Sequence, residues 1–248
     1  MNKRDKNLIY GRHPILDAFQ AGSSFEKIWI QQGLSGDIEK ELRHLCREHD
    51  VPMQYVPKDR LNRMAASGNH QGVAGLLSII RYMDVEDVVP QLYEQALTPL
   101  LVILDGITDV RNLGAIARSA ECLGAHGLVV GKKNAAPVNA EALKASAGAL
   151  TRLPVCRQNS LPATVDWLRL SGIQLIGTTL EESVAVTEVN FSLPTAIVLG
   201  SEDEGISEGV KSRMDTLCRI PQTGRTESLN VSVAAGIVLY EALRQRSL

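Results

Sequence analysis

The sequence predicts an α/β fold in which the C-terminal part forms an open parallel sheet. The leading observation is a continuous apolar run, Leu-Leu-Val-Ile-Leu, at residues 100–104, which is typical of a strand buried on both faces. Similar apolar runs follow at 127–130, 174–177, 196–199 and 217–220. Helical patterns separate these runs, at 113–123, 140–149, 161–170, 207–214 and 231–246. This alternation favours βα units and therefore a parallel sheet.

The first 80 residues predict a second, smaller α/β domain. Strands are expected at 27–30, 53–56 and 73–80, and helices at 14–21, 37–49 and 57–66. Residues 81–98 are acidic and expected to be helical from about residue 84, and they end at the breaker pair Thr98-Pro99, which indicates a linker. The predicted organisation is a domain at 1–80, a linker at 81–98 and a larger domain at 99–248.

The bulk composition is that of a soluble globular protein, with 44% apolar and 22% charged residues. No apolar run approaches the roughly 18 residues of a membrane span, and no signal-peptide pattern follows the charged N-terminus, so a cytoplasmic location without a membrane partner is expected. Four scattered cysteines without a CxxC pair predict buried reduced thiols. A net charge of −2 and 4% aromatic residues disfavour a broad base-stacking platform, although a local basic patch can still bind nucleic acid.

Three polar, glycine-containing loops follow predicted strands, at 105–118, 200–205 and 220–230. Open parallel sheets bind ligands beyond the carboxyl ends of their strands, so these loops predict one composite site. In the first loop, Asn112 can cap the helix that follows, and Gly114 allows a close backbone approach. In the third loop, Ser228 and Asn230 place side-chain oxygens beside the free N–H groups of a helix start.

Signatures of several other enzyme classes are absent from the sequence. No G-x-G-x-x-G follows the first strand and no G-x-x-x-x-G-K-[ST] occurs, which argues against a nucleotide-binding enzyme of those kinds. No G-x-S-x-G elbow supplies a hydrolase nucleophile. The five histidines form no H-x-x-x-H pair, so no metal site is predicted.

Together, the three loops resemble the three motifs of the SpoU (TrmH) family of RNA ribose 2′-O-methyltransferases, which belong to the SPOUT class. The motifs are Asn112-x-Gly114-Ala115-x-x-Arg118, then Leu199-Gly200-Ser201-Glu202-x-x-Gly205-Ile206, then Ile220-Pro221 with Ser228-Leu229-Asn230-Val231-Ser232-Val233-Ala234. The N-terminal part adds Tyr10-Gly11-Arg12-His13-Pro14 and His70-Gln71-Gly72-Val73. These look like the substrate-binding domain of the subgroup that contains the bacterial 23S rRNA guanosine-2′-O-methyltransferase RlmB.

The resemblance implies a C-terminal SPOUT domain threaded into a deep trefoil knot, an N-terminal domain similar to ribosomal proteins L7Ae and L30e, and a homodimer through the knotted domain. It implies S-adenosylmethionine as cofactor, a guanosine of 23S rRNA as substrate and no metal. The positions that match the family's cofactor-binding residues are Thr178, Leu199, Gly200, Ile220 and Leu229. The positions that match its catalytic residues are Asn112, Arg118, Glu202, Ser228 and Asn230.

One departure from the family pattern is visible, since Asp109-Val110-Arg111-Asn112 stands where a proline often follows the aspartate. A guanidinium is a poor base, because its pKa exceeds about 12, so we expect Arg118 to hold the ribose and phosphate and to stabilise the developing alkoxide.

RNA contacts are expected among eight basic residues, of which Lys132, Lys133 and Arg225 are favoured by their positions on loops. The eight are Arg12, Arg60, Arg63, Lys132, Lys133, Lys144, Arg152 and Arg225.

Three alternatives remain open at this point. The first is a 2′-O-methyltransferase that acts on tRNA or on another rRNA site, although the N-terminal domain favours 23S rRNA. The second is a catalytically silent RNA-binding ribosome-assembly protein, against which the five matched catalytic positions argue. The third is a small-molecule nucleotide-binding enzyme, which would carry a phosphate fingerprint that this sequence lacks.

Overall fold

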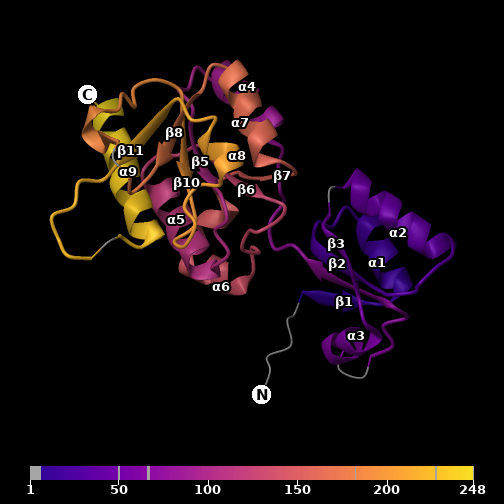
Figure 1. The fold of residues 1–248 in the computed structure, drawn as a ribbon. Coiled ribbons are helices and arrows are strands. Elements are labelled where there is room, and N and C mark those ends of the chain that lie inside the picture. Colours follow the sequence, from indigo (N-terminus) through magenta and orange to yellow (C-terminus); the bar gives the residue numbers. More distant parts are fainter. Residues whose placement is uncertain (1–6, 50, 66–67, 182, 227, 248) are drawn as a thin grey trace. The chain divides into compact units, whose positions relative to one another are not determined.

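The computed structural model describes residues 7–49, 51–65, 68–181, 183–226 and 228–247. The chain forms two compact units, Met1–Arg81 and Tyr82–Leu248, which are drawn in indigo to purple and in magenta to yellow (Figure 1). The charged segment 1–6 and Ala66, the last residue of the helix expected at 57–66, lie outside the described residues.

The first unit is a four-stranded mixed sheet with the order β1-β4-β2-β3. Only the β2–β3 pair is parallel. Along β2, Ile28 and Ile30 pack with α1 and α2, whereas Trp29 packs on the opposite face with Leu61 of α3. This alternation follows from the period of two in a strand. The elements are β1 Leu8–Tyr10, α1 Arg12–Gln20, β2 Phe25–Gln31, α2 Asp37–Glu48, β3 Met53–Val56, α3 Lys58–Ala65 and β4 Val73–Leu77.

The second unit is built on a seven-stranded sheet with the order β7-β6-β5-β10-β8-β11-β9. All six strand pairs are parallel, as the apolar runs predicted. Every residue of β5 and β10 is buried, because helices cover both faces of the sheet centre. The strands are β5 Leu100–Leu104, β6 Gly127–Gly131, β7 Val155–Gln158, β8 Gln174–Thr178, β9 Val184–Ala185, β10 Thr195–Leu199 and β11 Thr216–Arg219.

Helices α7 and α9 have the bounds that the sequence predicted, whereas α6 and α8 are shorter than expected. The stretch expected as one helix over 140–149 ends at Ala145 and continues, after a turn at Ala147 and Gly148, as the 3₁₀ helix η1. Positive φ values at both turn residues interrupt the α-helix there. The helical elements are α4 Val85–Glu94, α5 Val110–Cys122, α6 Ala140–Ala145, η1 Ala149–Thr151, α7 Leu161–Leu170, η2 Val186–Glu188, α8 Glu208–Lys211 and α9 Val231–Arg246.

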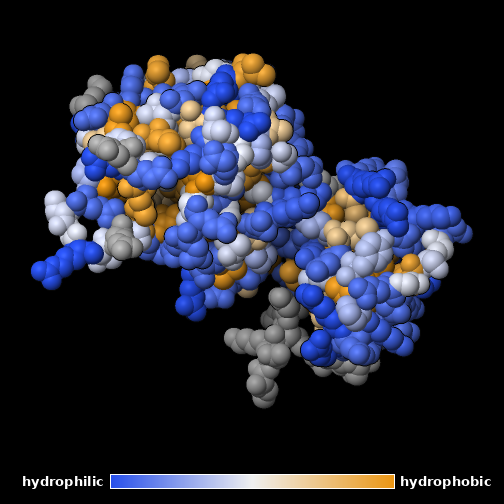
Figure 2. Space-filling model, viewed as in Figure 1, coloured by the Kyte–Doolittle hydropathy of each residue, from blue (hydrophilic) through white to orange (hydrophobic). Residues whose placement is uncertain are grey.

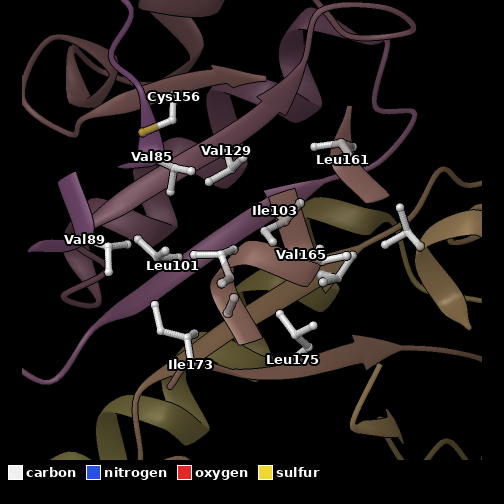
Figure 3. Close-up of a cluster of buried hydrophobic side chains, with 14 of the residues drawn as sticks. Val85, Val89, Leu101, Ile103, Val129, Cys156, Leu161, Val165, Ile173 and Leu175 are labelled. Carbon is white, nitrogen blue, oxygen red and sulfur yellow. The ribbon is translucent and has the colours of Figure 1, made fainter. Parts of the chain in front are cut away.

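The segment 81–98, expected to be a helical linker, carries the expected helix, but this helix is part of the second unit. Helix α4 buries Val85, Val88, Val89 and Leu92 in the same apolar cluster as Leu101 of β5. Figure 3 shows Val85 and Val89 beside the sheet residues of this cluster. The acidic residues of α4 make the segment look like a solvated connection, but its valines recur at helical spacing and form a buried stripe.

Strand order brings the three predicted loops to one edge of the sheet. Strand β5 lies between β6 and β10, and β10 lies between β5 and β8. Because these strands and β11 are parallel, the loops that follow their carboxyl ends meet at the same edge. The chain passes from β5 to β6 on one side and returns to β8 and β10 on the other. The strand order therefore reverses direction between the paired strands β5 and β10. Open α/β sheets bind ligands at such a topological switch point, beyond the carboxyl ends of the strands.

Helix α9 is fixed at its C-terminal end by a guanidinium that binds four backbone carbonyls. Arg246 donates from Nε to the carbonyl of Phe191, from Nη1 to Thr98, and from Nη2 to Pro99 and Leu193, at 2.7–3.0 Å. Burial lowers the pKa of Arg246 from its ordinary value. These bonds anchor α9 beside the start of β5 and β10, so the helix presents its N-cap residue, Asn230, at a defined place.

Candidate active site at the β5, β10 and α9 junction

Side chains from all three loops meet at one carboxylate, that of Glu202. Its Oε1 accepts hydrogen bonds from Asn112 Nδ2 at 3.2 Å and from Asn230 Nδ2 at 2.7 Å, and the backbone N–H of Val231 donates to it at 3.4 Å. Asn230 Nδ2 also donates to Asn112 Oδ1 at 3.1 Å. Asn112 and Asn230 are 118 residues apart in the sequence, so the fold alone brings them together.

The helix starts that hold this cluster are capped by side chains. Asp109 caps α5, because its carboxylate accepts from the N–H groups of Arg111 and Asn112 at 2.8 and 2.9 Å. The prediction that Asn112 would be the cap is wrong: Asn112 lies in the first turn and is free to point its amide at Glu202. Asn230 caps α9 by accepting from the N–H of Ser232 at 3.0 Å.

The loop after β10 is a tight turn held by the end of β5. Ser201 and Gly205 exchange two backbone hydrogen bonds of 3.0 Å each. Asp105 directly follows β5, and its Oδ2 accepts from the N–H of Ser207 at 2.8 Å while its own N–H donates to the carbonyl of Leu199. Asp105 was not among the predicted site residues, although its position after a buried strand and before a glycine is the signal that could have identified it.

A pocket of about 300 Å³ opens beside this cluster. Ligand pockets in proteins start at roughly this size. Its walls combine apolar side chains with polar ones, including the carboxylates of Glu181, Glu202, Asp203 and Glu204 and the ammonium group of Lys211. Lys211 Nζ lies 2.7 Å from Glu181 Oε1. The apolar side chains in its wall are Leu180, Ile206, Leu217, Ile220, Leu229, Val231 and Ala234.

Four of the five predicted cofactor-binding residues line this pocket: Thr178, Gly200, Ile220 and Leu229. Leu199 does not, because it is only 1% exposed and its side chain belongs to the core of the sheet. Two of the predicted catalytic residues, Glu202 and Ser228, also line the pocket. The structure therefore places Glu202 and Ser228 around the same pocket as four of the predicted cofactor-binding residues.

Arg118 stands apart from the hydrogen-bonded cluster. It is exposed on α5, six residues after Asn112, and within the described parts of the chain its guanidinium has no hydrogen-bond or ion-pair partner. Gly114, four residues earlier, allows a close approach between helices, because a Cβ there would overlap Ala145 and the carbonyl of Ala142. Helix α6 therefore packs closely on α5 at Gly114. The guanidinium of Arg118 makes no described contact that would stabilise the fold, so it is available to bind a ligand.

The basic residues of the second unit that were predicted to contact RNA divide into side chains with a partner and side chains without one. Arg152 is paired with Glu121 at 2.7 Å, and Lys132 donates to Asn159 at 3.1 Å. Lys133, Lys144 and Arg225 are exposed, and the described residues offer them no ion-pair partner. An exposed pair such as Arg152–Glu121 contributes little to stability and leaves less charge available for RNA.

The thiols are placed where they are chemically inert, with one exception. Burial raises the pKa of Cys156 to about 12 and that of Cys218 to about 11. Cys122, in the last turn of α5, is exposed, contrary to the expectation of four buried thiols.

Among the described residues no group of three or more histidine, cysteine or acidic side chains could hold a metal ion. No helix in that same part of the chain is long and apolar enough to cross a membrane.

Comparison with known protein families covers both units. The model of the SpoU rRNA methylase family matches residues 99–240, which is more than half of the chain. The chain belongs to this family. A second model, described as RNA 2′-O ribose methyltransferase substrate binding, matches residues 8–83. The predicted family is therefore confirmed, with the catalytic and substrate-binding regions in the predicted order.

Individual relatives agree with this membership. The chain is 36% identical over 241 residues to an uncharacterized tRNA/rRNA methyltransferase of Synechocystis, covering 97% of this chain and 63% of that protein. It is 31% identical to a putative TrmH family tRNA/rRNA methyltransferase of Bacillus subtilis, covering 96% of each. The crystal structure of the SpoU methyltransferase AviRb from Streptomyces viridochromogenes with AdoMet is 29% identical, with a TM-score of 0.61 over 97% of this chain and 90% of that one.

Proposed function

We propose that this chain transfers a methyl group from S-adenosylmethionine to the ribose 2′-hydroxyl of a guanosine in 23S rRNA. The observation that carries the proposal is that Asn112 and Asn230 both bind Glu202, which lines the same pocket as Gly200 and Leu229. Family membership and the substrate-binding match at residues 8–83 support an RNA substrate. A cytoplasmic location follows for an enzyme that acts on ribosomal RNA.

The pocket suits S-adenosylmethionine in shape and charge. Its apolar wall, with Ile206, Ile220 and Ala234, can hold an adenine ring, and the backbone of the turn at Gly200 and Gly205 offers hydrogen-bonding groups at close range. The carboxylates at its rim favour a cationic sulfonium centre. S-adenosylmethionine, when bound, supplies a methyl group on positively charged sulfur and leaves as a neutral thioether.

The side chains of this protein would then position the RNA and manage charge. Glu202 holds the amides of Asn112 and Asn230, so both amides keep fixed orientations toward the ribose. Arg118, whose guanidinium is free, would bind the adjacent phosphate and stabilise the alkoxide that develops on the 2′-oxygen. Because a guanidinium holds its proton at neutral pH, a phosphate oxygen of the RNA is the better acceptor for the hydroxyl proton. Such positioning supplies much of the acceleration in reactions of this kind.

The decisive test is to map 2′-O-methyl marks on total RNA from cells with and without the gene for this protein. We expect one guanosine mark in 23S rRNA to disappear without the gene and to return when purified protein and S-adenosylmethionine are added to that RNA. Loss of a mark in tRNA, with 23S rRNA unchanged, would reassign the substrate within the family. Identical maps from both cells, together with no transfer in vitro, would contradict an enzymatic role.

We also propose that two copies of the chain associate through α9, with the chain threaded into the knot that the family resemblance implies. Helix α9 carries an exposed apolar stripe beside its buried face: Val233, Ile237 and Tyr240 are 50%, 38% and 60% exposed. Exposed apolar patches of this kind mark interaction surfaces, and a second copy of the chain would cover this one. Apolar surface is visible on the second unit, among polar surface, in Figure 2.

Replacing Tyr240 with glutamate is expected to convert a dimer into monomers, because a carboxylate in an apolar interface is costly to desolvate. Mass measured by light scattering after gel filtration would show the change. Leu170→Glu is the matched control, since Leu170 is 88% exposed at the end of α7 and is not part of the α9 stripe. A Tyr240→Glu protein that stays dimeric would exclude this face as the interface, and a monomeric wild-type protein would exclude the dimer.

A further inference from the structure

Two segments of the first unit that lie 59 residues apart are joined around Arg12. The backbone N–H of Arg12 donates to Gln71 Oε1 at 3.1 Å, and its Nε donates to the carbonyl of Gln71 at 3.2 Å. The N–H of Gly11 donates to the carbonyl of Val73 at 3.1 Å. The bond from Nε directs the guanidinium toward the loop at Gln71, and its two terminal nitrogens have no partner among the residues described. A guanidinium fork with unused donors is suited to a phosphate group.

The loop at 68–72 is itself held in shape by a buried histidine. His70 is 6% exposed, its Nδ1 accepts from the N–H of Gly72 at 2.9 Å, and its Nε2 lies 2.9 Å from Asn62 Oδ1 on α3. Because Nδ1 is an acceptor, Nε2 carries the proton and donates to Asn62. Gln71 and Gly72 both have positive φ, of 50° and 82°, which turns the loop sharply back toward Arg12.

These bonds decide which ends of the amide groups remain available. Asn62 uses its oxygen on His70, so its NH₂ group is left to donate. Gln71 uses its oxygen on the backbone of Arg12, so its NH₂ group is also left to donate. These two NH₂ groups, the terminal nitrogens of Arg12 and the ammonium of Lys58 are all donors, so a ligand that contacts them must present acceptors. Gln31, Asn69 and His13 also line the pocket, and their side chains can accept as well as donate.

The same residues line a pocket of about 680 Å³ in the first unit. No aspartate or glutamate is among the described residues that line it, although the chain has 28 acidic and 26 basic residues. The pocket is therefore locally positive in a protein whose net charge is −2. A local field of this kind is what attracts a polyanion, whatever the overall charge.

We propose that this pocket binds one unpaired nucleotide of the RNA substrate, with Arg12 on its phosphate and the amide donors of Asn62 and Gln71 on acceptor atoms of its base. The proposal rests on the proposed function and adds a second point of attachment, distinct from the site of methyl transfer. Unpaired bases are the parts of RNA that proteins read by hydrogen bonds to base edges. The pocket would thereby contribute to the choice of RNA without taking part in the reaction.

The test uses the full-length protein and an unmodified 23S rRNA transcript. For Arg12→Ala we expect KM for the transcript to rise about tenfold, the loss of one charge-assisted contact. We expect kcat and the affinity for S-adenosylmethionine to stay within twofold of wild type. The slope of log K for RNA against log salt concentration should fall by about one. Lys58→Ala should reduce the same slope, which provides a second variant on another element.

Arg47→Ala is the matched control, because Arg47 is an exposed arginine on α2 outside the pocket. If Arg12→Ala and Lys58→Ala both behave like Arg47→Ala in KM and salt slope, the pocket does not bind RNA. If Arg12→Ala weakens the binding of polyglutamate as much as it weakens the binding of the transcript, the pocket is a general site for polyanions and the proposal of a nucleotide pocket is overturned. A wild-type protein that neither binds nor methylates the transcript refutes the proposed function, and this subsite with it, before any variant is made.

Discussion

Replacing Arg118 with alanine is expected to lower kcat for methyl transfer by about a thousandfold while leaving the affinity for S-adenosylmethionine within twofold of wild type. The loss of one group that stabilises a developing oxyanion typically costs a factor of this size. Arg118 is exposed, it has no partner within the described residues, and it does not line the cofactor pocket. Its removal should therefore disturb neither the fold nor the cofactor, and the deficit should appear in the chemical step.

Single-turnover transfer to a 23S rRNA transcript, with calorimetric titration of S-adenosylmethionine, would measure the two quantities separately. Arg111→Ala on the same helix is the control, since Arg111 is also exposed and is paired with Glu141 at 2.9 Å. We expect Arg111→Ala to retain turnover near the wild-type rate. An Arg118→Ala protein that turns over at the wild-type rate would remove this residue from the mechanism. Loss of cofactor affinity in that variant would move its role to the pocket.

The sheet of the second unit was largely predictable because its central strands are continuous apolar runs. Strand β7 was missed, and its sequence shows why: Arg157 and Gln158 stand in it, yet both are only 9% exposed. The guanidinium of Arg157 lies 4.0 Å over the ring of Tyr82, and Gln158 donates to Glu86. Polar residues that are buried through such distant partners do not look like strand residues in the sequence.

The candidate site was predictable as a set of loops but not as a set of contacts. Parallel strands place their carboxyl ends together, so the sequence could indicate that the loops of Asn112, Glu202 and Asn230 would meet. The individual hydrogen bonds could not be predicted, because they join residues that are far apart in the sequence. Asn112 binds Glu202, 90 residues away, and Asn230, 118 residues away, and the strand order alone brings them together. The local pattern gave Asn112 as a helix cap, and Asp109, three residues earlier, competes for that place and takes it.

The second large effect is expected at Gly200, the first residue after β10. A Cβ at this position would overlap the carbonyl carbon of Gly205 and the backbone nitrogen of Ile206. These are backbone atoms of the turn closed by the two hydrogen bonds between Ser201 and Gly205, so no side-chain rotation can relieve the overlap. Gly200→Ala must therefore open the turn that carries Glu202, and the hydrogen bonds of Glu202 to Asn112 and Asn230 would be broken with it.

We expect Gly200→Ala to weaken S-adenosylmethionine binding by at least about a hundredfold and to destabilise the protein by about 1–3 kcal/mol, the usual cost of overpacking. Titration calorimetry and thermal unfolding would measure both. Gly209→Ala is the control, because a Cβ there meets only Pro162, at 3.5 Å, and alanine favours the helix α8 in which it lies. Cofactor binding by Gly200→Ala as strong as by Gly209→Ala would show that the pocket does not depend on this turn. The cofactor would then have to bind elsewhere than between Gly200, Ile220 and Leu229.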